Sequence, residues 1–208
     1  LVEETREYNN TFVEIFMNLT HEEKELNIEI FQSSIEIAYN LGDYEKGIEY
    51  GEYFFSIISN IFNPNQYMII EAMLSLSKCY LALKNYQRAL ELNEKALKLS
   101  QITPNYRDLD KLSLLQVSKY NYLFIENDTS YVKLAIDQHY LLKKILWKQL
   151  HTLTNKDKYE YSKNAFSFYY ELINDIWFIK VSYPNRLKNI VLLKEIIYEG
   201  AILLKDLI

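Results

Sequence analysis

Few residues in this sequence have the type and spacing that chemistry would need, and the single cysteine is the first to consider. A catalytic thiol requires a lowered pKa, from a helix N-terminus or a nearby cation, together with a general base. Cys79 lies instead inside a predicted helix where apolar residues recur, and a free cysteine in such a place behaves as a small hydrophobic side chain. We therefore expect a buried structural thiol.

The three histidines have no spacing that suits a metal ion. Two ligands on one helix are normally about four residues apart, whereas His139 and His151 are 12 residues apart. His21 follows a predicted helix cap, and the sequence contains neither Glu-x-x-His nor His-x-x-x-His. We expect surface or hydrogen-bonded histidines, with no metal site and no cofactor.

The carboxylates are numerous, but they alternate with lysines, which is typical of the solvent-exposed side of a helix. Glu91 precedes Lys95 by four residues, which is the favourable orientation for an ion pair on one helix. No glycine-rich loop is present to hold a phosphate, because Gly42 stands alone in the break Leu41-Gly42-Asp43. The sequence therefore predicts no catalytic constellation, and we expect this chain not to be an enzyme.

The composition narrows the class of protein. The 208 residues suffice for one domain or one continuous helical array, and a net charge of −5 without a dense Lys/Arg run disfavours a nucleic-acid partner. No run of 18 apolar residues occurs, so we expect no membrane-spanning helix. One cysteine excludes an internal disulfide and fits a reducing, cytoplasmic compartment. Because the chain begins at Leu1 rather than Met, we interpret it as a piece of a longer protein.

Four glycines and three prolines are few for this length, which favours long helices over strands. Pro64, Pro104 and Pro184 are each followed by Asn, and we interpret them as breaks between helical hairpins. Thr20 and Glu23 fit a capping box. We expect an all-α fold whose helices cover residues 2–18, 21–40, 44–61, 66–83, 86–101, 106–125, 129–151, 157–181 and 186–207.

Two segments of the sequence resemble each other: LGDYEKGIEYGEYFFSII at 41–58 and LKNYQRALELNEKALKLS at 83–100. A fixed period of this size indicates a repeat architecture. A third repeat should begin near residue 112 and carry three or four extra residues in its turn. The matching pairs, all 42 residues apart, are Leu41 and Leu83, Tyr44 and Tyr86, and Gly47 and Ala89.

The second repeat resembles a tetratricopeptide repeat through Leu76, Tyr80, Leu83, Tyr86, Ala89 and Ala96-Leu97. Small residues let neighbouring helices approach closely, and large ones fill the space between them. The first repeat departs from this pattern at Phe55. The resemblance implies a right-handed α-solenoid of antiparallel helix hairpins over residues 1–151, with repeats near 21–61, 66–101 and 106–151.

The C-terminal part, residues 152–208, carries a second resemblance. It contains Leu153-Thr154, an aromatic-rich segment from Phe166 to Trp177, Pro184, and a closing Gly200-Ala201-Ile202-Leu203-Leu204. This order is similar to the helical hairpin that joins tetratricopeptide repeats to the CHAT domain in bacterial CHAT-family proteins. That family often has Lys where this chain has Glu199. The resemblance implies a caspase-like cysteine peptidase domain outside this chain, with the chain as its regulatory or docking arm.

In tetratricopeptide proteins the first helix of each hairpin lines a concave surface. The resemblance therefore implies a groove for a protein or peptide ligand, or for the protein's own C-terminal domain, with basic ligand residues near Glu29 and Glu36. We expect no nucleic acid and no membrane as partners, and a homo-oligomer stays open. The predicted lining residues are Glu29, Gln32, Glu36, Tyr39, Asn40, Glu71, Leu74, Lys78, Leu81, Ser113, Gln116 and Tyr120.

Other interpretations stay open. The groove residues are also consistent with a solvated surface that binds nothing, and peptide-sensing regulators use similar repeats. The aromatic residues Tyr159, Tyr161, Phe166, Phe168, Tyr169, Tyr170, Trp177 and Phe178 crowd one predicted helix and indicate either burial or a partner surface. A self-associating structural scaffold would use the apolar residues Val191, Ile196, Ile197 and Leu203.

Overall fold

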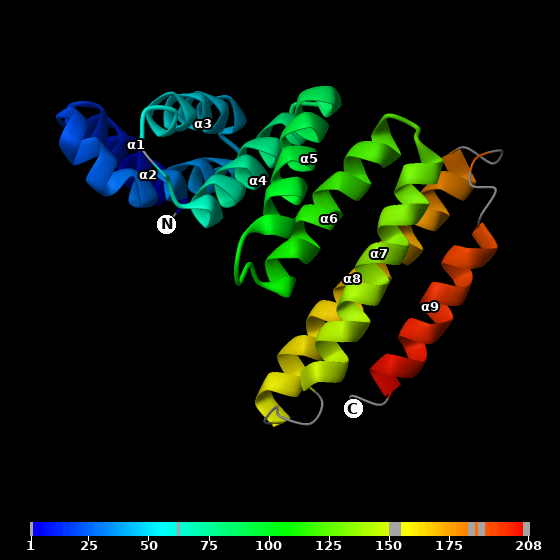
Figure 1. Ribbon diagram of the computed structural model, residues 1–208. Helices are drawn as coiled ribbons and strands as arrows, with labels where there is room; N and C mark the ends of the chain where they lie inside the picture. Colours follow the sequence, from blue (N-terminus) through cyan, green and yellow to red (C-terminus); the bar gives the residue numbers. More distant parts are fainter. Residues whose placement is uncertain (1, 62, 150–154, 183–185, 187–189, 206–208) are drawn as a thin grey trace. The chain divides into compact units, whose positions relative to one another are not determined.

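A computed structural model describes residues 2–61, 63–149, 155–182, 186 and 190–205, and these residues form helices and turns without a strand (Figure 1). The all-α prediction is confirmed. Most helices end within two residues of their predicted bounds, although the predicted ends at 151 and 207 lie outside the described residues. The helices are α1 (Val2–Met17), α2 (His21–Leu41), α3 (Tyr44–Ile58), α4 (Gln66–Ala82), α5 (Tyr86–Ile102), α6 (Asp108–Phe124), α7 (Asp128–Gln149), α8 (Asn155–Ser182) and α9 (Ile190–Lys205).

The chain divides into two compact units, Leu1–Tyr106 and Arg107–Ile208, each with its own apolar core. We call them the N-terminal and C-terminal units. The helices α6 and α7, the predicted third hairpin, belong to the C-terminal unit together with α8 and α9. The predicted boundary between residues 151 and 152 falls outside the described residues and stays a prediction.

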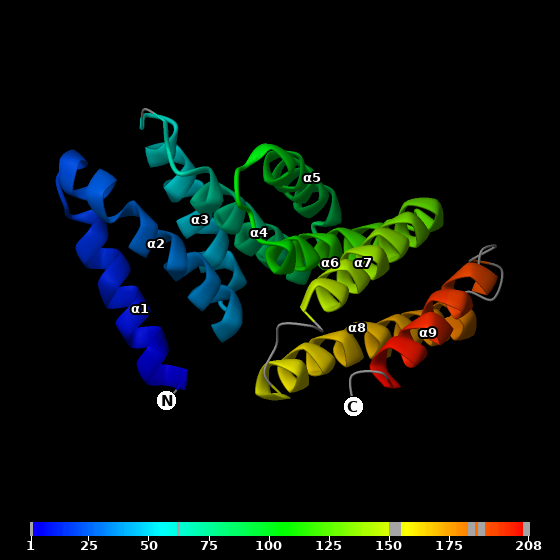
Figure 2. The same cartoon turned by 60° about the horizontal axis from the view of Figure 1, so that its bottom comes forward.

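The N-terminal unit is a series of helices in which neighbours pack against each other (Figure 2). The helix α1 packs on α2, α2 packs on both α3 and α4, and α4 also packs on α3 and α5. Aromatic rings fill the space between the first helices, because Phe16 of α1 stacks on Phe31 of α2 with ring centroids 4.2 Å apart. The two hairpins α2–α3 and α4–α5 thus share one core with α1.

Local capping fixes where α2 begins. The Thr20 side chain accepts a hydrogen bond from the Glu23 backbone, and Glu23 Oε2 accepts one from Thr20 N at 2.9 Å, so the predicted capping box is confirmed. Asp43 precedes α3 without capping it through its side chain. Its carboxylate instead accepts a hydrogen bond from Arg6 Nε at 2.8 Å, which ties α1 to the α2–α3 turn.

Backbone residues with positive φ recur every 21 residues, which is half of the sequence period. In the turn after α4, Asn85 N donates to Tyr80 O at 2.8 Å, and in the turn after α6 Asn127 N donates to Tyr122 O at 2.9 Å. These two turns are therefore equivalent and have the same length. The recurring residues are Gly42 (φ 80°), Asn63 (54°), Lys84 (62°), Asn105 (58°) and Glu126 (62°).

The expectation of extra residues in the third turn is therefore wrong. The 42-residue period continues unbroken to Asn127. The third hairpin differs from the others in one side chain after this turn. The position of Gly47 and Ala89 is taken by Tyr131 in the third hairpin, and this ring is fully buried. A large residue at the position of a small one disguised the register in the sequence.

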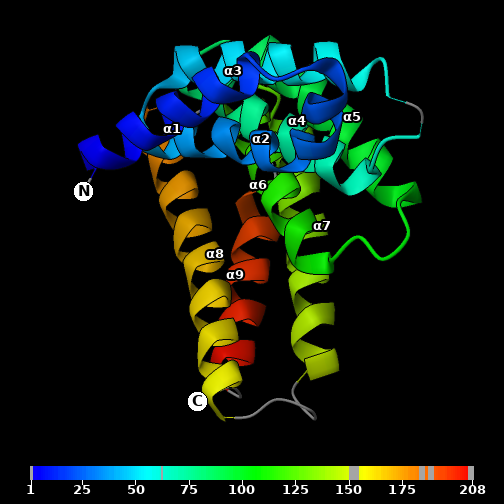
Figure 3. The ribbon, with the colours of Figure 1, turned by 90° about the vertical axis from the view of Figure 1, so that its left-hand side faces the viewer.

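The C-terminal unit consists of α6 to α9. The helix α6 packs on α7, and α7, α8 and α9 contact one another (Figure 3). The helices α8 and α9 run in opposite directions, as predicted for a hairpin (Figure 1). Gly200 of α9 lies directly against the Tyr169 ring, so any larger residue there would collide with it. Ile196 is buried in this core, which removes it from the apolar surface that we expected to be available for self-association.

Candidate functional site

Two of the predicted lining residues, from successive first helices, meet in the N-terminal unit. The Lys78 ammonium of α4 lies 5.6 Å from the centroid of the Tyr39 ring of α2, within the range of a cation–π interaction. Tyr39 is half-buried, and burial raises the pKa of its hydroxyl. The helices α2 and α4 therefore present one joint surface, which we call the α2–α4 face.

The other predicted residues of these two helices differ in exposure. Glu36 and Asn40 are exposed, whereas Gln32 and Leu81 are half-buried. Leu74 is only 4% exposed and offers little area to a ligand. The α2–α4 face comprises Glu29, Gln32, Glu36, Tyr39, Asn40, Glu71, Leu74, Lys78 and Leu81.

Two carboxylates of the α2–α4 face already have partners. Exposed Glu29 accepts a hydrogen bond from Asn65 Nδ2 at 3.0 Å. Half-buried Glu71 accepts one from the Tyr106 hydroxyl at 2.8 Å. These bonds hold the two acids in fixed orientations, and exposed Glu36 adds a third carboxylate to the same face. The face therefore has Glu29 and Glu36 on its α2 side, and the Lys78 cation together with Glu71 on its α4 side.

The three predicted residues of α6 belong to the C-terminal unit and are engaged there. Gln116 Nε2 donates a hydrogen bond to Glu171 Oε2 of α8, and the Tyr120 hydroxyl lies 3.4 Å from the same oxygen. Ser113 is exposed. The structure thus groups the α2 and α4 residues together and places Gln116 and Tyr120 against α8, and one continuous groove along α2, α4 and α6 stays a prediction.

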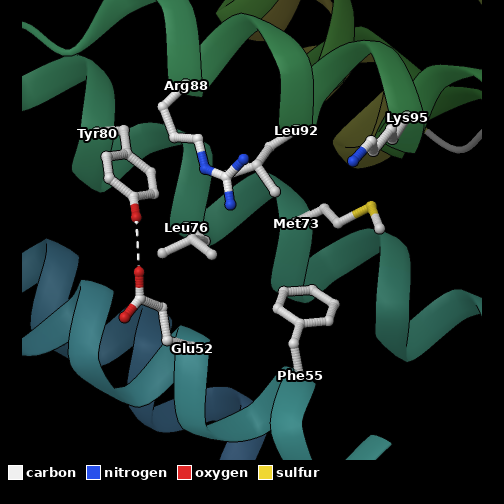
Figure 4. A pocket seen from close by; sticks show the side chains of 8 residues that line it. All are labelled: Glu52, Phe55, Met73, Leu76, Tyr80, Arg88, Leu92 and Lys95. Atoms are coloured by element: carbon white, nitrogen blue, oxygen red, sulfur yellow. Dashed lines mark hydrogen bonds between the residues drawn. The ribbon is translucent and has the colours of Figure 1, made fainter. Parts of the chain in front are cut away.

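A cavity of about 380 Å³ lies between α3, α4 and α5 of the N-terminal unit. Figure 4 shows its apolar wall, and the Tyr80 hydroxyl donates a hydrogen bond to Glu52 Oε1 at 3.1 Å at one end. Arg88 and Lys95 reach it from α5, so one side of the cavity is cationic. The lining residues are Glu52, Phe55, Met73, Leu76, Tyr80, Arg88, Leu92 and Lys95.

Sequence reasoning missed this cavity because it considered only the first helix of each hairpin. A signal was present nevertheless, since Phe55 departs from the small residue that the repeat pattern favours. Its ring packs edge-on against Phe54 at 5.1 Å and contributes to the cavity wall. Glu91 was expected to pair with Lys95, but it accepts a hydrogen bond from Arg88 Nη1 at 3.1 Å.

The candidate nucleophile has the environment of a structural residue. Cys79 is fully buried beside Gly47, and burial raises the pKa of its thiol to about 12. A thiol with that pKa stays protonated at neutral pH and is a poor nucleophile. This agrees with the predicted structural role of Cys79.

The histidines give no metal site in the part of the chain that the structure describes, where no cluster of three or more His, Cys, Asp or Glu residues could hold an ion. His139 is buried, with Nδ1 2.9 Å from the Tyr169 hydroxyl and Nε2 3.1 Å from Glu199 Oε2. Its burial lowers the pKa of the imidazole, against the opposing effect of Glu199. His21 lies 3.3 Å from Glu25, and His151 lies outside the described residues.

A buried ion pair lies in the C-terminal unit and was not predicted. The Lys119 ammonium is fully buried and lies 3.2 Å from Asp175 Oδ2, which also accepts a hydrogen bond from the Tyr131 hydroxyl at 2.9 Å. The rings of Tyr120, Tyr131 and Phe168 surround the ammonium with centroids at 5.5, 5.9 and 5.5 Å. Burial lowers the pKa of Lys119, while Asp175 opposes that shift. The cluster joins residues of α6, α7 and α8 around an ammonium that is closed to solvent, which is the arrangement of a structural contact.

The aromatic side chains of helix α8 fall into two groups, one buried and one exposed, so both predicted environments occur. Phe168 and Tyr169 are buried in the core of the C-terminal unit. Phe166, Tyr170 and Trp177 are exposed, and the first two stack with ring centroids 6.2 Å apart. The side chains of Tyr159 and Tyr161 lie outside the described part.

Comparison with known families adds one finding at this point. Residues 31–102 match the tetratricopeptide repeat family. The match runs from Phe31 in α2 to Ile102 at the end of α5, and it therefore covers the α2–α4 face apart from Glu29, together with the cavity of Figure 4. Searches of curated proteins and of solved structures found no match.

The chain thus contains a tetratricopeptide-repeat region, and such repeats generally mediate protein–protein interaction. Within the described residues, no helix combines the length and the apolar character needed to cross a lipid bilayer.

Proposed function

We propose that the tetratricopeptide region is a protein-interaction module that binds an extended partner segment on the α2–α4 face. The contact between the Lys78 ammonium and the Tyr39 ring carries this proposal, because it joins the first helices of two successive hairpins into one surface. An aromatic ring with an adjacent cation and nearby carboxylates offers a partner both apolar contact area and polar anchors. The residues needed for recognition are therefore together on a rigid support.

The charges of the face define the ligand that fits it. Glu29 and Glu36 lie on the α2 side, so basic residues of the partner belong there. Near Lys78 the partner should present a carboxylate or a backbone carbonyl, since an ammonium has only donors. A short segment with a basic half and an acidic or neutral half satisfies both ends of the face.

The test begins with a library of random peptides displayed on phage and selected against the full chain. Selected peptides are then titrated against the wild type and against the double variant Tyr39→Ala/Lys78→Ala. Loss of a central aromatic and its paired cation should weaken binding about tenfold or more, which is the effect of removing about 1.4 kcal/mol. Lys98→Ala, an exposed lysine of α5, is the matched control and should bind like the wild type. Unchanged binding by a double variant whose circular dichroism is intact would exclude the α2–α4 face.

The cavity in Figure 4 provides a second candidate position for the same function. Its volume of about 380 Å³ and its cationic α5 side favour a large apolar side chain next to a carboxylate. Peptides selected for that cavity would carry an acidic–apolar pattern. Their binding would be lost in Phe55→Ala and Lys95→Glu and retained in Tyr39→Ala/Lys78→Ala, so the two variant sets separate the two sites.

We further propose that the chain serves as the docking arm of a larger CHAT-type cysteine peptidase. The close contact between Gly200 and the Tyr169 ring supports this, because it gives a reason for a small residue at the end of the closing helix. Glu199, where the family often has Lys, contacts both His139 and Lys143, and a lysine there would face a second cation.

Reading the native open reading frame past Ile208 tests this context. A caspase-like segment with a His and a Cys is the expected result. A stop codon or an unrelated domain would contradict the proposal and leave the interaction module without a peptidase.

A further inference from the structure

The 42-residue period extends backwards to α1. The helix α1 covers Val2–Met17 and α3 covers Tyr44–Ile58, so the two begin 42 residues apart. The same offset aligns Tyr8 with Tyr50 and Phe12 with Phe54. The helix α1 therefore occupies the second-helix position of a repeat, which the comparison of residues 41–58 with 83–100 did not reveal.

The contact between α1 and α2 also repeats the contact between α3 and α4. Gly51 of α3 lies so close to α4 that an added Cβ would be 2.8 Å from Leu76 Cδ1. The equivalent residues of α1 and α2 are Asn9 and Ser34, and Asn9 Nδ2 donates a hydrogen bond to Ser34 O at 3.3 Å. The helix pairs α1–α2 and α3–α4 are therefore equivalent in both sequence and packing.

These two helix pairs differ in what covers them. The helix α2 packs on both α3 and α4, and its Phe31 ring lies 6.3 Å from the Tyr50 ring. In the N-terminal unit, α1 lies at the end of the described series, beside α2 (Figure 2). Four apolar residues on α1 and α2 are exposed although their equivalents are buried. The pairs are Tyr8 (76% exposed) and Tyr50 (5%), Ile15 (59%) and Ile57 (7%), Leu26 (77%) and Met68 (6%), and Ile30 (57%) and Ala72 (0%).

A groove of about 300 Å³ lies between α1 and α2. Each helix contributes four residues at the spacing i, i+3, i+4 and i+7, beginning at Thr5 and at Ile30. Asn9 in this groove is 7% exposed, and its Oδ1 has no hydrogen-bond partner among the described residues. A buried acceptor without a donor lowers stability, so the groove is suited to an occupant that supplies one.

We propose that this surface, the α1–α2 face formed by Tyr8, Ile15, Leu26 and Ile30 around the groove, binds an amphipathic helix of a partner protein. The occupant should have the apolar spacing of α2, whose Phe31, Ile35 and Ala38 are buried and whose Phe31 ring lies beside the Tyr50 and Tyr53 rings of α3. It should also place a hydrogen-bond donor opposite Asn9. Within the described part of the N-terminal unit, α2 to α5 are each packed against their own neighbours, and we assign the helix to a partner on the basis of charge.

Charge adds a further requirement for the partner helix. The helices α1 and α2 carry seven glutamates besides Glu29 and Glu36 of the α2–α4 face, but one arginine and one lysine. A helix whose polar side is basic complements this surface and is steered towards it. The partner is thus expected to combine an α2-like apolar stripe with lysines or arginines on its other sides.

A synthetic peptide provides a defined probe. It carries residues 20–41 with every glutamate replaced by lysine, which keeps the apolar stripe of α2 and reverses its charge. The fluorescein-labelled peptide is titrated with the full chain, and binding is followed by fluorescence anisotropy. The control peptide has the same charge but carries Phe31→Ser and Ile35→Ser. We expect saturable binding of the first peptide and none of the second.

Variants of the chain locate the site. Ile30→Lys changes an exposed side chain and should weaken binding about tenfold or more, whereas Ile102→Lys, which is also exposed but lies on α5, should leave it within about twofold. Tyr39→Ala/Lys78→Ala should also leave it unchanged, which separates this site from the α2–α4 face.

Three results would overturn the proposal: no saturable binding, equal binding of the control peptide, or equal binding by Ile30→Lys. Sedimentation velocity of the chain alone supplies a fourth. A dimer that Ile30→Lys converts to a monomer would assign the face to a second copy of the chain instead of a partner helix.

Discussion

One position of the repeat holds a glycine in the N-terminal unit and a large aromatic residue in the C-terminal unit. Gly47 in the N-terminal unit leaves no room for a side chain, because an added Cβ would lie 2.6 Å from the Cys79 sulfur. Tyr131, 84 residues later at the same repeat position, is a buried ring whose hydroxyl reaches Asp175 at 2.9 Å. The same backbone period is therefore stabilised by close helix approach in one unit and by a buried polar cluster in the other.

This difference predicts two kinds of sensitivity. In the N-terminal unit the close contacts are apolar, so steric changes there should have moderate and local effects. In the C-terminal unit a buried charge depends on one partner, and removal of that partner leaves the other charge uncompensated. Variants in the two units should therefore differ in how much they lower the free energy of unfolding and in which second substitution restores it.

The largest effect is expected at the buried ion pair. Asp175→Ala leaves the Lys119 ammonium and the Tyr131 hydroxyl without their shared acceptor, and should lower the free energy of unfolding by about 3–5 kcal/mol. Urea unfolding followed by circular dichroism measures it. The double variant Lys119→Met/Asp175→Leu removes both charges and should recover most of the loss. A double variant as unstable as Asp175→Ala would show that the charges are not the source of the effect.

A smaller effect is expected at the tight contact of the N-terminal unit. Gly47→Ala should cost about 1–3 kcal/mol because its methyl group meets the Cys79 sulfur. In a Cys79→Ala background the same change should be neutral or stabilise by up to about 1 kcal/mol, because alanine favours helix more than glycine does. A double-mutant cycle measures the coupling. Additive effects of the two changes would rule out the steric explanation.

The positive-φ residues predict an effect of about 1 kcal/mol. Lys84 adopts φ 62° where Gly42 adopts 80° in the equivalent turn, and a left-handed conformation disfavours residues with a Cβ by about 1–2 kcal/mol. Lys84→Gly should therefore stabilise the N-terminal unit by about 1 kcal/mol, less the entropy that glycine adds to the unfolded chain. Lys98→Gly, within α5, is the matched control and should destabilise. Thermal unfolding distinguishes them, and destabilisation by both variants would contradict the prediction.

The smallest expected effect is the dependence of the free energy of unfolding on pH. Burial lowers the pKa of His139 in the folded chain, and the charge of Lys143 adds to this shift, whereas the contact with Glu199 opposes it. The ring also contacts the Tyr169 hydroxyl. As the pH decreases, His139 therefore becomes protonated in the unfolded chain before it does in the folded chain. The free energy of unfolding should fall as the pH decreases from about 7.5 to 5.5, through the unfolded pKa of about 6.5. Glu199 has a lowered pKa and contributes only at more acidic pH. His139→Gln should show a flatter dependence, and an equal slope in both proteins would exclude His139 as the cause.

The sequence allowed the helices and the repeat to be predicted because both depend on local signals. Thr20 and Glu23 mark a helix start, and Leu41 and Leu83 mark equivalent turns. The third repeat was misjudged because Tyr131 replaces the small residue on which the pattern depends. Its ring is buried in the core of the C-terminal unit, where its hydroxyl donates a hydrogen bond to Asp175, which is far away in the sequence.

The candidate sites also differ in how far local signals in the sequence indicate them. The meeting of Tyr39 and Lys78 follows from the stacking of first helices, which the repeat pattern implies. The cavity between α3, α4 and α5 depends on how three helices diverge around Phe55, and the α1–α2 face depends on a register that two matching segments do not reveal. Tertiary packing determines the cavity, whereas the α1–α2 face follows from the 42-residue period once that period is extended back to α1.

The most direct test of the central claim is a hydrogen-exchange footprint of a selected peptide on the full chain. The α2–α4 face predicts slower amide exchange in α2 and α4 around Tyr39 and Lys78 when the peptide is bound. Protection of α3, α4 and α5 that leaves α2 unchanged would instead place the ligand in the cavity of Figure 4 and contradict binding on the α2–α4 face.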